Sequence, residues 1–250
     1  MSSANTNQQL ARQKVFAGVD VGGTRIKIGL ANASGRLLSC EMLETQGIND
    51  AENFLEAVAR EIGKQAARTP LTVAGAGVGC PGRIDFTTGT VIWLKSKLEF
   101  LEGIALAERL GRRLGCVVVC DNDVNTMLAG EMRFGAGRGC RDVVAVTVGT
   151  GIGGALVLSG RMVRGRNWAA GHFGYMSFDP KGTPHVCGNT GIAEEHASLS
   201  GISRELRRTQ GTGEVSPLTE LLARGQEPAC ASYSRRPTQE TNLAAAWRIV

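Results

Sequence analysis

The feature that most constrains this chain is a strand, a glycine turn and a second strand, a pattern that occurs twice. In the first copy, two runs rich in β-branched residues, Val15–Val21 and Arg25–Ala31, flank Gly22 and Gly23. Glycine can adopt the positive φ angles of a tight hairpin at no steric cost, so we expect an antiparallel hairpin here. Residues 143–158 repeat the pattern. The repetition predicts a duplicated α/β protein.

The first turn also carries polar groups that suit a magnesium–phosphate ligand. Asp20 precedes the turn and Thr24 follows it, so a carboxylate, a hydroxyl and glycine amides converge at one tip. Amides without a nearby Cβ can approach phosphate oxygens, and a carboxylate can hold Mg²⁺ directly or through water. The alternative is an ordinary hairpin in which Asp20 and Thr24 only satisfy local backbone groups. The second copy favours the phosphate interpretation, with two hairpins gripping one polyphosphate.

Composition excludes several classes of protein. With 250 residues, 42% of them hydrophobic, the chain can bury a substantial core. The formal charge of +5 is mild and no run of five like charges occurs, so we expect no nucleic-acid partner. Seven scattered cysteines without a C-x-x-C pair indicate reduced thiols and a cytoplasmic location. No apolar run approaches the roughly 18 residues of a membrane span, and residues 1–13 read as a disordered leader.

Apolar spacing, caps and turn residues predict the rest of the first half: a strand over 36–43, a helix over 50–68 capped by Asn49 or Asp50, a buried strand over 71–78, a rigid turn at 79–85, a helix over 103–114, a strand over 116–120 and a helix to about Phe134. This order is βββαβα. A glycine-rich joint follows at 135–141, and the βββ pattern then begins again. We therefore expect an N-terminal lobe over 14–134 and a C-terminal lobe over 135–250.

The second copy does not finish in sequence. A helix is expected near Ala193–Arg208, but residues 229–240 are polar and lack periodicity, and the chain ends at Val250. We expect the C-terminal lobe to be incomplete, as in a truncated or frame-shifted version of a longer protein.

Asp123 is the strongest candidate for a catalytic residue. It lies where a strand ends and a helix begins, and open α/β sheets bind ligands beyond the carboxyl ends of their strands. A carboxylate there can accept the proton of a substrate hydroxyl as it attacks a phosphate, which supplies roughly 10²–10⁴-fold in rate. The alternative is that Asp121, Asn122 and Asp123 form a redundant helix cap.

Five blocks of the chain together resemble the ROK family of bacterial sugar kinases and sugar-responsive repressors. In order they are D-V-G-G-T-R-I-K (20–27), G-V-G-C-P-G-R-I-D (77–85), N-D-V-N-T-M-L-A-G-E (122–131), V-G-T-G-I-G-G (148–154) and C-G-N-T-G-I-A-E (187–194). The resemblance covers about Val15 to Leu206. It implies an actin-like, ribonuclease-H-like ATPase fold, two lobes with a cleft, and it implies ATP and Mg²⁺ as cofactors.

The resemblance also assigns roles to individual residues. The first phosphate motif is Asp20, Gly22, Gly23, Thr24 and Lys27, and the second is Thr150, Gly151, Gly153 and Gly154. Asp123 matches the catalytic aspartate, Asn122 the sugar-binding asparagine and Glu194 a ligand of a sugar hydroxyl, and we also expect Gly82 and His172 to contact the sugar. Lys97 falls near a position where the family tends to place a sugar-binding asparagine.

Two motifs depart from the family pattern. The family's E-x-G-H run appears here as His172 to Tyr175, so a histidine that can hydrogen-bond a hydroxyl replaces a bidentate carboxylate. The zinc motif C-x-C-G-x-x-G-C appears as residues 185–192, in which His185 and Cys187 are plausible ligands but Ile192 is not. We therefore predict that the protein binds no zinc, and that packing around Ile192 and Tyr175 holds this loop.

These observations predict an ATP-dependent, glucokinase-like kinase of a hexose or amino-sugar hydroxyl, with Asp123 as general base. Two alternatives stay open, a non-catalytic sugar-binding regulator and a decayed kinase. The expected partner is a small-molecule sugar, with no membrane partner. A homodimer is possible because family members are often dimers.

Overall fold

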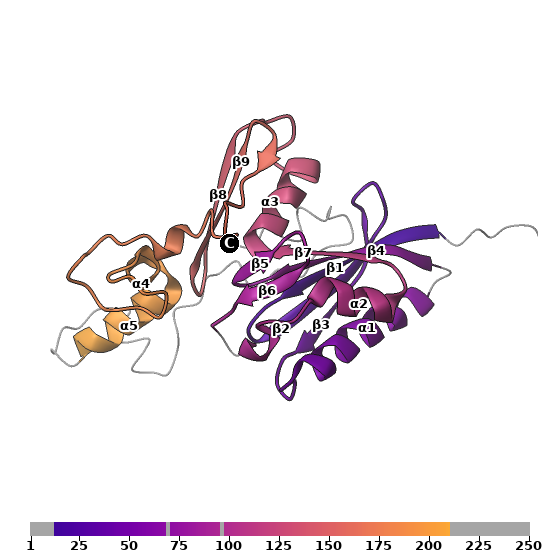
Figure 1. Ribbon diagram of the computed structural model, residues 1–250, viewed down its shortest axis with the longest axis horizontal. Helices are drawn as coiled ribbons and strands as arrows, with labels where there is room; N and C mark the ends of the chain where they lie inside the picture. Colours follow the sequence, from indigo (N-terminus) through magenta and orange to yellow (C-terminus); the bar gives the residue numbers. More distant parts are fainter. Residues whose placement is uncertain (1–12, 69–70, 96–97, 211–250) are drawn as a thin grey trace, which may run out of the picture. The chain divides into compact units, whose positions relative to one another are not determined.

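The computed structural model describes residues 13–68, 71–95 and 98–210. The chain divides into two compact units, one reaching to Thr126 and the other starting at Met127. We call them unit 1 and unit 2 (Figure 1). The expected leader, Lys97 and the expected incomplete C-terminal region beyond residue 210 lie outside the described residues.

Unit 1 is built on a five-stranded sheet with the strand order β3-β2-β1-β4-β7. Its elements are β1 (Gln13–Val21), β2 (Arg25–Ala31), β3 (Leu37–Glu44), α1 (Ala51–Ala67), β4 (Leu71–Cys80), α2 (Leu106–Leu114) and β7 (Val117–Asn122). The helix α3 (Asp123–Phe134) follows β7, and its residues from Met127 onward belong to unit 2. The first three strands form an antiparallel meander, and β4 and β7 run parallel to β1. The predicted βββαβα order and the first hairpin are therefore confirmed.

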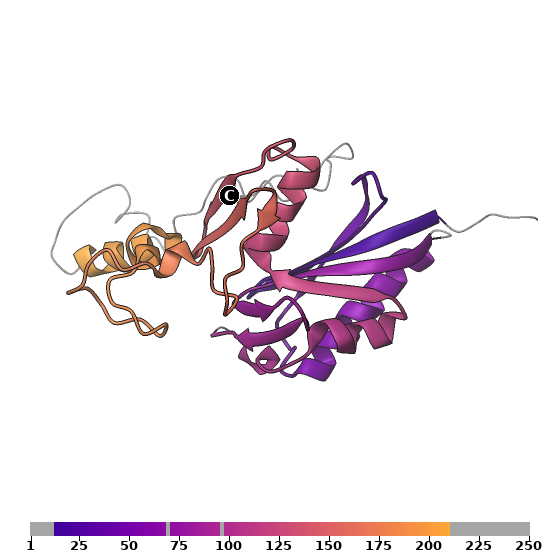
Figure 2. The same ribbon diagram turned by 45° about the horizontal axis from the view of Figure 1, so that its top comes forward.

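Helices α1 and α2 cover the same face of this sheet (Figure 1, Figure 2). Alternation along β1 explains which side chains they cover, because Val15, Ala17 and Val19 are buried whereas Phe16 is 46% exposed. The helical spacing in α1 buries an apolar stripe made of Phe54, Leu55, Val58 and Ile62. Of the two residues expected to cap α1, Asp50 is the N-cap, since its Oδ1 accepts a 2.8 Å hydrogen bond from Asn53 N.

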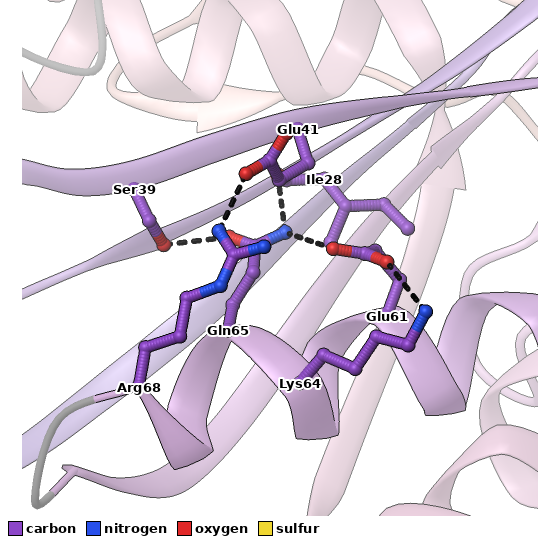
Figure 3. A network of polar contacts seen from close by, with 7 residues as sticks. All are labelled: Ile28, Ser39, Glu41, Glu61, Lys64, Gln65 and Arg68. Atoms are coloured by element: carbon purple, nitrogen blue, oxygen red, sulfur yellow. Dashed lines mark hydrogen bonds and ion pairs between the residues drawn. The ribbon is translucent and has the colours of Figure 1, made fainter.

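A buried amide fixes α1 to the sheet (Figure 3). Gln65 is 1% exposed, and its Nε2 donates to the carbonyl oxygen of Ile28 at 3.1 Å while its Oε1 accepts from Ser39 Oγ at 2.6 Å. At the end of the helix, Arg68 forms a 2.6 Å ion pair with Glu41. Because buried polar groups must be hydrogen-bonded, Gln65 stabilises one placement of α1 over β2 and β3.

The prediction of a rigid turn over residues 79–85 is wrong in part, because the last three of these residues form a strand. β5 (Arg83–Asp85) pairs with β6 (Thr90–Trp93) in a small antiparallel sheet, followed by the short helix η1 (Glu99–Leu101). Asp85 Oδ1 accepts hydrogen bonds from Thr87 N and Thr88 N, which closes the hairpin. Three- and four-residue strands leave too short an apolar pattern to be recognised in sequence.

Unit 2 contains a three-stranded antiparallel sheet in the order β10-β9-β8. Its elements are β8 (Val143–Val148), β9 (Ile152–Leu158), β10 (Arg161–Met162), η2 (Phe173–Tyr175), α4 (Ala193–Ala197) and α5 (Leu199–Gln210). The second predicted hairpin is thus present. The single helix expected near Ala193–Arg208 is instead two helices, because Ser198 is extended and its Oγ accepts from Gly201 N, as at a helix N-cap.

No helix in the ranges described above combines the length and the apolar character needed to cross a membrane.

Candidate functional site

The first glycine turn presents exposed backbone amides. Gly23 and Thr24 are exposed, and their carbonyl oxygens accept from Thr45 Oγ1 at 3.0 Å and Thr45 N at 2.9 Å. Their N–H groups donate to no acceptor within the part of the chain that the structure describes. Two exposed amides beside a glycine can bind an anion such as a phosphate oxygen.

Of the two glycines in this turn, Gly22 is needed for space, and neither is needed for a positive φ angle. Neither Gly22 nor Gly23 has a positive φ angle, so the expectation that these glycines supply positive φ angles to the hairpin is wrong. At Gly22 a Cβ atom would lie 2.7 Å from the carbonyl oxygen of Arg25, which itself accepts from Gly22 N at 3.0 Å. At Gly23 the corresponding position is open.

Charged groups line up across the sheet next to this turn. Asp20 lies directly opposite Lys27 in the β1–β2 register, with 3.6 Å between Oδ2 and Nζ. Burial raises the pKa of Asp20, and the positive charge of Lys27 opposes that rise. On its other side Asp20 pairs with Gly79, which pairs with Asp121. The structure thus brings the first phosphate motif to the carboxyl ends of β1, β4 and β7, where open α/β sheets bind ligands.

Asn122 is the residue that caps α3. Its Oδ1 accepts from Val124 N at 2.9 Å and Asn125 N at 3.3 Å, and its Nδ2 donates to the carbonyl oxygen of Gly82 at 3.0 Å. Asp121 Oδ1 accepts hydrogen bonds from Asn122 N and from Asn125 Nδ2, so it helps to hold Asn122 in the capping position. Asn122 therefore suffices as the cap, and Asp123 at the first helical position is left for another role.

Asp123 is a partly exposed carboxylate with a perturbed pKa. Burial, with the negative charge of Asp20 added, raises its pKa from 3.8 to about 6, and a 3.0 Å hydrogen bond from Val124 N opposes the rise. Gly79 allows the helix to start here, because a Cβ atom at that position would lie 3.3 Å from both Asp123 Cα and Thr126 Oγ1. Gly79 lies in one of the five sequence blocks but was not among the predicted site residues.

In unit 2 the second hairpin contacts Glu194, a residue predicted to bind the sugar. Glu194 Oε2 accepts a 2.8 Å hydrogen bond from Ile152 N, the amide that follows Gly151. A Cβ atom at Gly151 would lie 2.4 Å from that carboxylate oxygen, so a larger residue there would displace the Glu194 carboxylate. The structure therefore joins Glu194 to the predicted phosphate turn, a contact across 42 residues that sequence spacing did not indicate.

Other glycines of the second hairpin serve packing. At Gly154 a Cβ atom would lie 2.1 Å from the ring of Phe173 and 2.3 Å from the carbonyl oxygen of Gly171. Gly154 pairs with Val146, and Gly153 pairs with Thr147, in the β8–β9 ladder. The tip is tied to α5, because Leu199 N donates to the carbonyl oxygen of Gly149 at 2.9 Å.

The loop aligned with the zinc motif is held by packing and ring contacts. Ile192 is fully buried, and the ring of Tyr175 stacks on His172 and makes a tilted contact with His185, at centroid distances of 5.7 and 5.5 Å. His185 Nδ1 accepts from Cys187 N at 3.2 Å. These contacts agree with the expected packing around Ile192 and Tyr175, and the absence of zinc stays a prediction.

The residues of unit 1 fit a magnesium ion held mainly by substrate. Within the described ranges no group of three or more histidine, cysteine, aspartate or glutamate side chains forms a metal site. Mg²⁺ in phosphoryl-transfer sites usually needs only one or two carboxylates, with phosphates and water completing its shell. Asp20 and Asp123 supply two carboxylates close enough for the charge of one to raise the pKa of the other.

A separate groove of about 440 Å³ lies elsewhere in unit 1. It is lined by the turn at 86–89, by α2 and by residues 116–120 of the sheet edge. None of the predicted site residues lines this groove.

A sequence model of the ROK family matches residues 16–247. The chain belongs to the ROK family. The suspected resemblance is therefore confirmed, and it extends over most of the chain.

Individual ROK relatives agree with this assignment. A glucokinase from Thermotoga maritima is 34% identical over 86% of this chain and 67% of its own length. A crystal structure of a ROK family glucokinase from Streptomyces griseus in complex with glucose and AMPPNP is 30% identical, with a TM-score of 0.70 over 86% of this chain and 72% of that chain. A putative xylose repressor from Caldicellulosiruptor is 30% identical over 74% of this chain and 46% of its own length.

The ROK protein described here has the actin-like ATPase fold of such kinases, as predicted. Its chain spans about two thirds of the length of the curated glucokinases it matches.

Proposed function

We propose that this ROK protein transfers the γ-phosphate of ATP to a hydroxyl group of a hexose or an amino sugar. The observation that carries the proposal is Asp123, whose pKa is raised to about 6 at the carboxyl end of β7. A carboxylate with that pKa is ionised at neutral pH and is a stronger base than an ordinary aspartate. Asp20 and the open glycine turn belong to the same unit.

In the proposed reaction the sugar hydroxyl gives its proton to the Asp123 carboxylate while the hydroxyl oxygen attacks the γ-phosphorus, and ADP leaves. The N–H groups of Gly23 and Thr24 would bind phosphate oxygens, because they face no acceptor in the described chain. Asp20, oriented by Lys27, would hold Mg²⁺ directly or through water. Bound Mg²⁺ would neutralise phosphate charge.

Further groups are proposed to orient the sugar and the nucleotide. The second N–H of the Asn122 amide, beyond the one that bonds Gly82, would donate to a sugar hydroxyl. In unit 2, Glu194 and His172 would bind sugar hydroxyls, and the Thr150–Gly151 turn would bind phosphate. The hydrogen bond from Ile152 N to Glu194 supports the proposal that the sugar-binding glutamate and the phosphate-binding turn lie next to each other.

The alternative function is sugar binding without catalysis, and the similarity to a putative xylose repressor supports it. A regulator would bind the sugar and release no ADP, whereas a decayed kinase would do neither. A cytoplasmic reaction follows from ATP as the proposed donor. A homodimer, also proposed, can be measured by sedimentation.

A coupled ADP-release assay tests the proposal. The protein is given Mg-ATP and a panel of hexoses and amino sugars, beginning with glucose, and thermal shifts record sugar binding in parallel. Asp123→Asn should lower sugar-dependent turnover at least about 100-fold. Glu56→Gln, which removes an exposed carboxylate from α1, is the matched control and should keep full activity. Sugar binding without ADP release would favour the regulator and refute the kinase.

A further inference from the structure

Consecutive backbone amides form the tip of the second glycine turn, and a carboxylate of this chain occupies one of them. Gly149 N donates to the carbonyl oxygen of Gly151 at 2.9 Å, which closes the turn. The next two N–H groups, those of Thr150 and Gly151, donate to no acceptor in the described ranges. The following amide, Ile152 N, donates to Glu194 Oε2 at 2.8 Å. Unoccupied and occupied donors of one anion-binding turn therefore follow one another along the chain.

The main chain of Glu194 is fixed beside this turn. Leu199 N donates to the carbonyl oxygen of Gly149 at 2.9 Å, and Ser200 N donates to that of the next residue at 3.4 Å. These two bonds hold the junction of α4 and α5 against the tip of the turn. Ser198 N joins Glu194 to the same junction, because it donates to the Glu194 carbonyl oxygen at 3.2 Å. Movement of the Glu194 carboxylate away from the turn therefore requires only a rotation of its side chain.

The negative charge of Glu194 lies where a phosphate group would bind. A Cβ atom at Gly151 would lie 2.4 Å from Glu194 Oε2, so the carboxylate lies against the backbone of the turn. The adjacent Glu195 forms a 3.1 Å ion pair with Arg204, whereas no ion pair joins Glu194 to a basic side chain in the described part of the chain. Because its charge is not neutralised, Glu194 repels an anion that approaches the neighbouring amides.

We propose that Glu194 is a switch that couples the two substrates of the proposed kinase reaction. Without ligands its carboxylate accepts from Ile152 N and competes with phosphate for the turn. A phosphate group that binds the turn takes over this donor and repels the carboxylate, which becomes available to a sugar hydroxyl. A bound sugar in turn holds the carboxylate away from the turn. Each ligand therefore raises the affinity for the other by the same factor.

The switch rests on the proposed function, in which Glu194 is a ligand of the sugar and the second glycine turn binds phosphate. It adds a regulatory role for the same residue, since the protein without sugar binds the nucleotide against the charge of its own carboxylate. The coupling needs no movement of the backbone of unit 2.

Titration calorimetry with Mg²⁺ and the non-hydrolysable ATP analogue AMPPNP measures the competition on the full chain. The test variant is Glu194→Gln, because glutamine keeps the shape and the hydrogen-bond acceptor of glutamate and removes only its charge. The matched control is Glu205→Gln, which removes an exposed carboxylate from α5 of the same unit. In the absence of sugar the test variant should bind AMPPNP roughly tenfold more tightly than the parent, whereas the control should bind as the parent does.

A second set of titrations contains saturating glucose. Glucose should tighten AMPPNP binding roughly tenfold in the parent and in Glu205→Gln, because the sugar holds the Glu194 carboxylate away from the turn. This gain should be lost in Glu194→Gln, which has no charge to withdraw. Circular dichroism verifies that the variants fold. Glu194→Ala, which removes the carboxylate entirely, should also bind AMPPNP more tightly than the parent.

Three results would overturn the switch. The first is equal AMPPNP affinity in Glu194→Gln and the parent. The second is weaker binding by Glu194→Gln, since that would make Glu194 a ligand of the nucleotide's Mg²⁺. The third is the absence of any gain from glucose in the parent.

Failure of the switch and failure of the kinase proposal can be told apart. If Glu194→Gln binds AMPPNP more tightly while the ADP-release assay finds no turnover in the parent, the kinase proposal fails and the competition at the turn stands. If the parent turns over and the AMPPNP affinity of Glu194→Gln is unchanged, the kinase stands and the switch fails.

Discussion

Replacing Asp123 with asparagine should make the protein more stable at neutral pH while removing its proposed activity. Burial and the charge of Asp20 raise the pKa of Asp123 from 3.8 to about 6. The folded protein therefore carries an ionised carboxylate at pH 7 that would ionise more readily in the unfolded chain. Asparagine has nearly the same shape and no charge, so it removes the free-energy cost of keeping a buried carboxylate ionised.

The size and the pH window of the effect follow from the shift. About 2 pKa units correspond to an upper limit of about 3 kcal/mol, and partial solvent access at Asp123 reduces this to about 1–2 kcal/mol. Between about pH 4 and pH 6 the folded state binds more protons than the unfolded state, so stability falls as pH rises through that window. The gain from Asp123→Asn should therefore be complete at pH 7.5 and vanish below about pH 4.

Differential scanning calorimetry at pH 4, 5.5 and 7.5 measures this gain. For a chain of this length, 1–2 kcal/mol corresponds to a rise in Tm of about 2–8 °C at pH 7.5. Glu56→Gln, at an exposed position on α1, should leave Tm unchanged at each pH. The reasoning would be refuted if Asp123→Asn melted below the parent at pH 7.5, or if its gain were the same at pH 4.

Three further predictions concern catalysis. kcat/KM should rise with pH with a midpoint of about 6, and Asp20→Asn should lower that midpoint by less than about one unit, because burial is the larger cause of the shift; a midpoint that does not move would contradict this. Gly22→Ala should raise KM for ATP roughly tenfold, since its Cβ would lie 2.7 Å from a carbonyl oxygen, whereas Gly23→Ala meets open space and should change KM little; equal effects would count against the argument. Glu194→Gln can still accept from Ile152 N and should keep the parent Tm while weakening sugar binding about tenfold, as calorimetry would record; unchanged affinity would exclude Glu194 as a sugar ligand.

The sequence predicted the parts of the fold that depend on local pattern. Alternation and glycine spacing located both hairpins, and the Asp50 cap located the start of α1. The β5–β6 hairpin was not predicted, because its stability comes from contacts distant in sequence, such as the hydrogen bond from Val91 N to the carbonyl oxygen of Ile104. Pairings of this kind cannot be read from a short apolar run.

The candidate site shows the same division. The Asp20–Lys27 pair follows directly from two residues facing each other across a predicted hairpin. The role of Gly79 depends on how closely α3 approaches β4, and the contact of Glu194 with the second turn depends on the path of a 42-residue excursion. Neither of these two contacts is encoded in the spacing of a motif.

The amide buried at position 65 makes the seating of α1 directional. An apolar helix face can slide or rotate slightly over a sheet at little cost, but a single side chain that must meet both Ile28 and Ser39 permits only one setting. β2 starts at the turn whose amides are proposed to hold phosphate. Because Gln65 fixes α1 to β2, we expect the base of that turn to keep its position when a phosphate group binds or leaves.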